Sequence, residues 1–297
     1  MHEKAAALLQ KVQLPPMFRV RQVFDRTHIA PEDIPDYIAG MLSDAPHTRK
    51  IRPGMRIAIT VGSRGVANIL IITKAIADFV KSRGAHPFVV PAMGSHGGAT
   101  AEGQRAVLAG YGVTEETVGC PILSSMEVKK IGVNADGMDV FIDKNAAEAD
   151  GIIVNCRIKP HTSFRGPFES GIMKMMTIGL GKQVGADDIH GQSPAIMHEL
   201  IEEYGRTILT NCPVLGGIAL LENAYDQTCR IRGLMDRVKE LGQDSVAITD
   251  HGVMYGCIDF YKAAKAAGIK PIIGCEVYVA RRGMEDRVHG LDNDPYH

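Results

Sequence analysis

The chain has no tryptophan, and aromatic residues make up only 5% of its 297 residues. It also lacks an excess of charge of either sign, because its net charge at pH 7 is −1. A protein that binds nucleic acid or a membrane surface through its overall charge needs a marked positive balance. The composition therefore predicts neither nucleic acid nor a membrane as a partner.

Long hydrophobic runs and paired cysteines are also missing. No apolar run reaches the ~18 residues that a membrane span needs, and residues 1–12 lack the apolar core of a signal peptide. The six cysteines are scattered without a CxxC pair, a distribution typical of reduced thiols in a protein core. We expect a soluble, cytoplasmic protein, and the hydrophobic fraction of 45% is sufficient for a substantial core.

Strand-like apolar runs alternate with helical patterns along most of the chain. Buried strands are predicted at 56–61, 87–91, 151–156 and 214–221, with helices at 66–82, 101–111 and 194–210. A hairpin is predicted at 127–142, and after residue 228 come helices at 231–241 and 257–268 and strands at 245–249 and 271–279. The alternation predicts an α/β fold in which a mostly parallel, Rossmann-like sheet has flanking helices.

Three glycine-rich stretches, at 62–65, 94–98 and 158–192, each follow a predicted strand and are predicted to be loops. Arg64 lies in the first, His96 in the second, and His161, Lys174 and His190 in the third. Because the carboxyl ends of parallel strands share one edge of a sheet, we expect these side chains to converge. Glycine-rich loops expose backbone N–H groups to an anion, although a single such loop is more often only a turn.

The histidines in these stretches are candidates for proton transfer or metal binding. His96 and His161 each follow a strand, and two imidazoles on opposite sides of a substrate can serve as acid and base near neutral pH. His190 is a candidate metal ligand through one neutral nitrogen. For each histidine taken separately, a hydrogen-bonded loop residue without chemistry is an equally good interpretation.

Residues 1 to about 226 resemble the N-terminal catalytic domain of the nickel-pincer lactate racemase family. The matching pieces occur in the family's order: Gly62-Ser-Arg-Gly65, Gly94-Ser-His96, Lys159-Pro-His161, Gly171-Ile-Met-Lys174 and Asp188-Ile-His190. The resemblance implies a racemase or epimerase of a small 2-hydroxy acid or polyol-type substrate. It also implies hydride transfer through a nickel-bound pyridinium-3-thioamide-5-thiocarboxylic acid mononucleotide, the nickel-pincer nucleotide.

The same resemblance implies roles for individual residues. Lys174 tethers the cofactor and His190 ligates the nickel. His96 and His161 alternate in accepting the proton of the substrate hydroxyl. The remaining contacts to cofactor or substrate are assigned to three residues: Arg64, Gly94 and Ser95. The chain departs from the family at Val61, where the family has an acidic residue, and at Gly97, where an arginine is common.

Residues from about 229 to 297 resemble the start of the PHP domain of the bacterial DNA polymerase III alpha subunit. The segments that match this family are Cys229-Arg-Ile231, Ala247-Ile-Thr-Asp-His-Gly252, Asp259-Phe-Tyr-Lys-Ala-Ala264 and Lys270-Pro-Ile-Ile-Gly-Cys-Glu-Val-Tyr278. The resemblance implies a partial metal site at Asp250, His251 and Glu276. The family's opening His-x-His strand is missing, so we expect these to be inherited residues without a working site.

The two resemblances predict a domain boundary, with a racemase-like domain at 1–226 and a truncated PHP-like segment at 227–297. The racemase family's C-terminal domain, which closes over the active site, has no counterpart in the sequence. We therefore expect impaired racemase activity, because hydride chemistry needs a site closed to water. The alternatives are a working PHP-domain fragment of a DNA polymerase III alpha subunit and a chimera without function.

Overall fold

The computed structural model describes residues 23–45, 47–159, 168–193, 196–233, 245–251 and 270–276. The chain forms two compact units, of which the larger spans Asp25–Gln243 and is called the main unit below. The smaller unit combines Met1–Phe24 with Asp244–His297. No helix among the described residues is long and apolar enough to cross a membrane.

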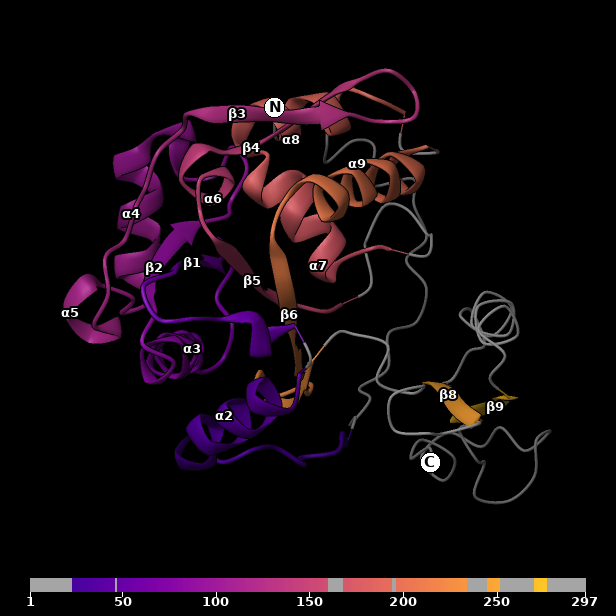
Figure 1. Ribbon diagram of the computed structural model, residues 1–297. Helices are drawn as coiled ribbons and strands as arrows, with labels where there is room; N and C mark the ends of the chain where they lie inside the picture. Colours follow the sequence, from indigo (N-terminus) through magenta and orange to yellow (C-terminus); the bar gives the residue numbers. More distant parts are fainter. Residues whose placement is uncertain are drawn as a thin grey trace, which may run out of the picture. The chain divides into compact units, whose positions relative to one another are not determined.

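The main unit is built on a five-stranded sheet with the order β2-β1-β5-β6-β7 (Figure 1). Its strands are β1 (Arg56–Val61), β2 (His86–Pro91), β5 (Gly151–Arg157), β6 (Val214–Glu222) and β7 (Thr228–Gly233). The first four run parallel, and β7 pairs antiparallel with β6. The predicted α/β fold with a mostly parallel sheet is therefore confirmed. The parallel strands are nearly continuous buried runs because helices cover both faces of the sheet.

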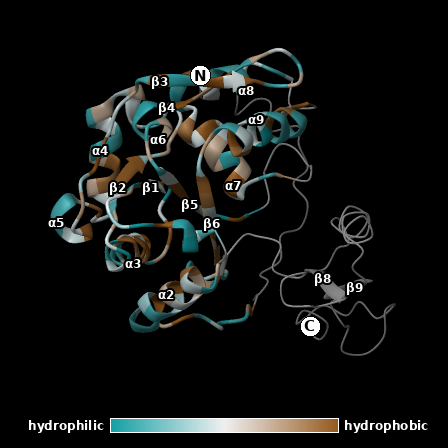
Figure 2. Ribbon diagram, in the orientation of Figure 1, coloured by the Kyte–Doolittle hydropathy of each residue, from teal (hydrophilic) through white to brown (hydrophobic). Residues whose placement is uncertain are grey.

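Two apolar clusters hold the sheet, one on each face. The first joins it to α2 (Ile34–Asp44), α3 (Ile69–Ser82), α4 (Ala101–Gly110) and α5 (Glu115–Val118). The second joins it to the hairpin of β3 (Val128–Val133) and β4 (Asp139–Asp143), to α9 (Met197–Asn211) and to the segment 171–190. Figure 2 shows β6 as mostly hydrophobic, whereas α3 and α9 carry hydrophobic and hydrophilic sides.

Further short helices in the described part of the main unit are η1 (Pro31–Asp33), η2 (Thr48–Lys50), η3 (Gly97–Ala99) and α6 (Lys144–Ala147). The predicted hairpin at 127–142 is confirmed, since β3 and β4 pair antiparallel in a sheet of their own.

The stretch 171–190 was expected to be a loop, and this prediction is wrong. It forms three consecutive helical segments: α7 (Gly171–Lys174), the π-helical η4 (Met175–Leu180) and α8 (Lys182–His190). Met176, Leu180 and Ile189 are fully buried in the second cluster, so the burial of one apolar side stabilises the helical backbone. A π-helical turn of this kind is often found at a functional site.

The helix predicted from residue 231 is also wrong at its start, because residues 228–233 form β7. The strand pairs Leu220 with Ile231, and Ile231 is only 1% exposed within the first cluster. Pairing and burial outweigh the local helical pattern here. The predicted boundary at residue 226 stays a prediction, although the sheet of the main unit continues beyond it.

The smaller unit contains β8 (Ser245–His251) and β9 (Lys270–Glu276), which pair in parallel. The register places Asp250 opposite Cys275 and His251 opposite Glu276, at the carboxyl ends of both strands. The two strands confirm the predicted ones at 245–249 and 271–279 in type and position. The helix predicted at 257–268 lies outside the described residues.

Candidate functional site

A cavity of about 340 Å³ lies at the carboxyl ends of β1, β2, β5 and β6. Five of the predicted site residues line it, namely Arg64, Ser95, His96, Lys174 and His190. Gly94 lies beside them and its N–H donates to the carbonyl of Gly179 at 3.1 Å. The structure therefore brings the three glycine-rich stretches together, while the chemical roles of these residues stay predictions. His161 lies outside the described residues.

The first two loops are bound to each other through Ser63. Its hydroxyl forms a short hydrogen bond with Nδ1 of His96, and the Tyr111 hydroxyl donates to the Ser63 carbonyl at 2.7 Å. With Nδ1 engaged, Nε2 is the His96 nitrogen that remains for a ligand. Sequence reasoning missed Ser63 because a serine in a glycine-rich turn has no distinguishing signal.

The second loop needs glycine at two positions. Gly94 and Gly97 have φ angles of 58° and 69°, in the left-handed region that favours glycine. A Cβ at Gly97 would lie 2.7 Å from the Gln104 backbone nitrogen. A side chain at this position would therefore not fit this loop conformation.

A buried lysine supports the second loop, at 94–98. Lys182 is fully buried, and its ammonium group donates to the Pro91 carbonyl at 2.5 Å and to Gln104 Oε1 at 2.9 Å. The Gln104 amide then donates to the carbonyls of Gly94 at 2.9 Å and His96 at 3.2 Å. These contacts fix the backbone that carries His96.

Lys182 also pairs with Asp143, whose carboxylate lies 3.1 Å from the ammonium nitrogen. Burial raises the pKa of Asp143 and lowers that of Lys182, and the attraction between them opposes both shifts. Removing one partner would leave the other charge buried without compensation. The pair therefore belongs to the framework of the site, and no pattern in the sequence predicted it.

Lys174 ends α7 and is partly buried in the cavity wall. Burial lowers its pKa to about 8, assisted by the positive charges of Arg64 and Lys159. Partial burial and the charge of Lys174 likewise lower the pKa of His190, which is still exposed on one side, while Asp187 opposes the shift. At neutral pH the imidazole of His190 is therefore mostly neutral and offers a lone pair to a ligand.

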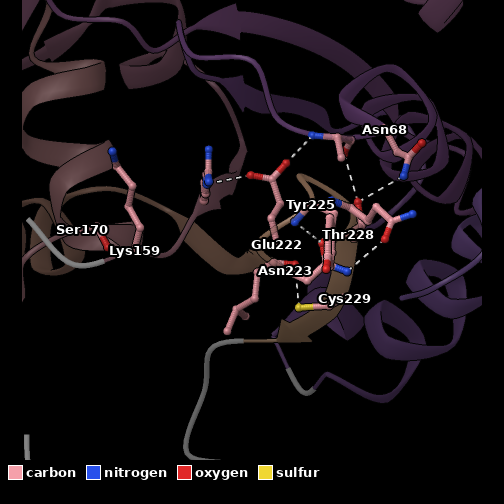
Figure 3. A network of polar contacts seen from close by, with 12 residues as sticks. Asn68, Lys159, Ser170, Glu222, Asn223, Tyr225, Thr228 and Cys229 are labelled. Carbon is pink, nitrogen blue, oxygen red and sulfur yellow. Dashed lines mark hydrogen bonds and ion pairs between the residues drawn. The ribbon is translucent and has the colours of Figure 1, made fainter. Parts of the chain in front are cut away.

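Glu222, at the end of β6, lies in a network of polar contacts (Figure 3). Its side chain is 2% exposed, and one oxygen lies 2.7 Å from Nε of Arg157. The other oxygen accepts the Ala67 backbone N–H at 2.6 Å. The Thr228 hydroxyl donates to the Ala67 carbonyl and accepts from the Asn68 amide, both at 3.1 Å. The start of β7 therefore holds the chain that follows the first loop.

Positive charge dominates the cavity lining. Among the described residues, the charged groups that line it are Arg64, Arg157, Lys159, Lys174 and Glu169. Arg157 is compensated by Glu222, and the remaining excess of cations favours an anionic ligand. The sequence singled out Lys159 only as part of a motif, yet its positive charge lowers the pKa of Lys174.

Within the part of the chain that the structure describes, no group of three or more His, Cys, Asp or Glu side chains is arranged to hold a metal ion. The nickel site implied by the racemase resemblance does not depend on such a group, because it takes His190 as its protein ligand.

Two family models match the chain. The PHP domain model matches residues 222–297, and the model described as "Domain of unknown function (DUF362)" matches residues 65–230. The two matches overlap at 222–230, where β6 ends and β7 begins.

Curated relatives match the C-terminal part of the chain. The DNA polymerase III alpha subunit of Helicobacter pylori is 57% identical over 54 residues, which cover 18% of this chain and 4% of that protein. The corresponding subunit of Treponema pallidum is 44% identical over 73 residues, or 24% of this chain and 6% of that protein. The chain thus spans only a small fraction of the length of these relatives.

Among solved structures, the lactate racemase apoprotein from Thermoanaerobacterium thermosaccharolyticum has a similar fold. The superposition has a TM-score of 0.51 at 14% identity and covers 86% of this chain and 69% of that chain. The shared fold agrees with the racemase resemblance read from the sequence. The match to residues 65–230 covers more than half of the chain, and the chain therefore belongs to the DUF362 family.

Proposed function

We propose that the main unit is a nickel-dependent racemase or epimerase of a small 2-hydroxy acid or polyol-type substrate. The observation that carries the proposal is the convergence of Arg64, His96, Lys174 and His190 on one cavity at the carboxyl edge of the sheet. Their motifs are separated by up to 126 positions in the chain, so no local pattern brings them together. The fold shared with a lactate racemase supports the same reading.

The residues of the cavity fit a nickel-pincer nucleotide. Lys174 supplies an amine for the tether, and His190 supplies a nitrogen ligand compatible with nickel and sulfur donors. The bound group would supply the acceptor and donor of hydride at the substrate carbon. Gly62 and Gly179 let the Met175 side chain of the cavity lining pack closely against the backbone, because a Cβ would lie 3.1 Å from Met175 Cε at Gly62 and 2.9 Å from Met175 Sδ at Gly179.

The chain's own residues would bind the substrate and move its hydroxyl proton. Arg64 and Lys159 would bind the carboxylate of a 2-hydroxy acid, since both cations face the cavity. Nε2 of His96 would take the hydroxyl proton, while Ser63 holds Nδ1. Inversion needs a second acid–base group on the opposite face, and we assign this role to His161.

The activity is expected to be low, because Arg64, His96 and His190 are exposed. Water that reaches the reacting atoms weakens electrostatic stabilisation and intercepts reactive intermediates. The exposure supports the expectation of an impaired enzyme.

A single-enantiomer substrate with deuterium at C2 tests the proposal. Protein co-produced with the enzymes that make the nickel-pincer nucleotide is expected to interconvert the enantiomers of lactate or of a related hydroxy acid. Because hydride transfer bypasses water, the deuterium should stay at C2. The His96→Gln variant should lose activity by about 10²-fold or more, the usual contribution of a general acid–base group.

His86→Gln serves as the control, since His86 is exposed at the start of β2, at the opposite edge of the sheet. Complete exchange of deuterium with solvent would point to proton abstraction and contradict the hydride mechanism. Equal activity of His96→Gln and the unmodified protein would remove His96 from the proposed site.

A further inference from the structure

Asn155 is a buried amide in the floor of the cavity. It lies in β5 two residues before the strand ends, lines the cavity, and is only 1% exposed. Its backbone N–H donates to the Thr60 hydroxyl at 3.0 Å, and that hydroxyl donates back to the Asn155 carbonyl at 3.3 Å. The neighbouring strand thus fixes the backbone that carries the side chain.

Neither polar atom of the Asn155 side chain has a hydrogen-bond partner among the described residues. Buried amides are normally satisfied, because an unpaired buried donor or acceptor costs free energy. Gln104 shows the usual arrangement in the same protein, since it is fully buried and uses both ends of its amide. The unused donor and acceptor of Asn155 therefore mark a position where a ligand is expected to bind.

The amide restricts the chemistry of that ligand. Asn155 presents one acceptor beside two N–H donors, so its complement has a donor next to an acceptor. A carboxylate alone would satisfy only Nδ2, and the hydroxyl and carboxylate of lactate are already assigned to His96, Arg64 and Lys159 in the proposed function. Two adjacent hydroxyl groups satisfy both atoms, because one donates to Oδ1 while the other accepts from Nδ2.

We propose that the side chain of Asn155 binds a vicinal diol of the ligand in this cavity. Two sources of such a diol fit the chemistry, namely the ribose of a pyridinium mononucleotide and the hydroxyl chain of a polyhydroxy acid. This choice of ligands rests on the proposed function, whereas the binding itself needs neither nickel nor turnover. If the diol belongs to the substrate, the enzyme prefers polyhydroxy acids to lactate.

Binding measurements on the full chain, purified without cofactor, test the proposal. Isothermal titration with nicotinic acid mononucleotide probes the ribose, and titration with D-gluconate probes the polyhydroxy acid. The Asn155→Leu variant is expected to weaken binding of at least one of them by about tenfold or more, the effect of losing a buried hydrogen-bonded pair. Loss with the nucleotide alone assigns Asn155 to the cofactor, and loss with gluconate alone assigns it to the substrate.

Thermal unfolding without ligand gives the second readout. Asn155→Leu removes two unsatisfied polar atoms, so its Tm should be equal to or above that of the unmodified protein. The matched control, Gln104→Met, removes a satisfied buried amide and should lower the Tm. A lowered Tm for Asn155→Leu would show that the amide is satisfied within the protein and would overturn the proposal.

The side-chain amide signal of Asn155 in ¹⁵N-labelled, unmodified protein provides a readout that does not depend on the variant. Its resonances should shift when the diol-bearing ligand is added. Signals unmoved by both ligands, or equal dissociation constants for Asn155→Leu and the unmodified protein, would also overturn the proposal. A negative racemase assay would leave these binding outcomes unchanged.

Discussion

A chain that ends after Asp226 is expected not to fold, whereas a chain that ends after Gln243 should unfold cooperatively. The shorter chain lacks β7, whose Thr228 and Ile231 are buried in the main unit. Thr228 also accepts the Ile29 backbone N–H at 2.8 Å. Without β7, the paired edge of β6 is exposed, and an exposed apolar edge promotes aggregation.

The size of the effect follows from Ile231. Truncating a buried isoleucine to alanine costs about 2–5 kcal/mol, and a typical domain has only about 5–15 kcal/mol of stability. Ile231→Ala alone should therefore lower the Tm markedly, and removal of the entire strand should abolish the transition. Arg230→Ala, at the exposed position before it, should change stability by no more than about 0.5 kcal/mol.

Circular dichroism and calorimetry on both truncated chains measure the effect. Equal unfolding transitions for the two chains would contradict the assignment of β7 to the main unit. Residues 222–230 are matched by both family models, and the strand that begins at Thr228, β7, completes the sheet of the main unit.

The second large effect concerns the reactivity of Lys174. Its pKa of about 8 lies below that of a free lysine, near 10.4, because burial and neighbouring cations disfavour the ammonium form. Protonation removes the nucleophilic lone pair, so acylation of Lys174 should rise with pH and level off above pH 8. Near neutral pH the fraction of unprotonated amine should exceed that of an ordinary lysine by about two orders of magnitude.

Peptide mass spectrometry after brief acetylation at pH 6 to 11 measures this profile in protein without cofactor, with the exposed Lys50 as an internal reference. Arg64→Gln removes a positive neighbour and should move the midpoint of Lys174 to higher pH. Arg49→Gln, remote from the cavity lining, should leave it in place. A midpoint for Lys174 near pH 10.4 in the unmodified protein would refute the effect of the cavity.

Much of the framework could be predicted from the sequence, because its signals are local. The buried runs at 56–61, 87–91, 151–156 and 214–221 correspond to β1, β2, β5 and β6. Since parallel strands expose their carboxyl ends at one edge, the convergence of Arg64, His96, Lys174 and His190 followed from topology.

What escaped prediction depends on contacts between distant segments. Lys182 and Gln104 are separated by 78 positions, and nothing in either local pattern indicates that they meet. The helical state of 171–190 comes from burial against the sheet and not from local sequence, which is rich in glycine. Asn155 did leave a signal, because it interrupts the apolar run at 151–156, and a buried polar side chain in such a run normally has a hydrogen-bond partner.

We propose above that this cavity holds a nickel-pincer nucleotide through Lys174 and His190. Intact mass spectrometry combined with nickel analysis, on protein co-produced with the pincer-forming enzymes, tests it most directly. The claim predicts a covalent adduct that maps to Lys174 and one nickel per chain. Lys174→Arg should lose the adduct, and His190→Ala should keep the adduct but lose most of the nickel. An unmodified Lys174 with no nickel, or full nickel content in both variants, would contradict the claim.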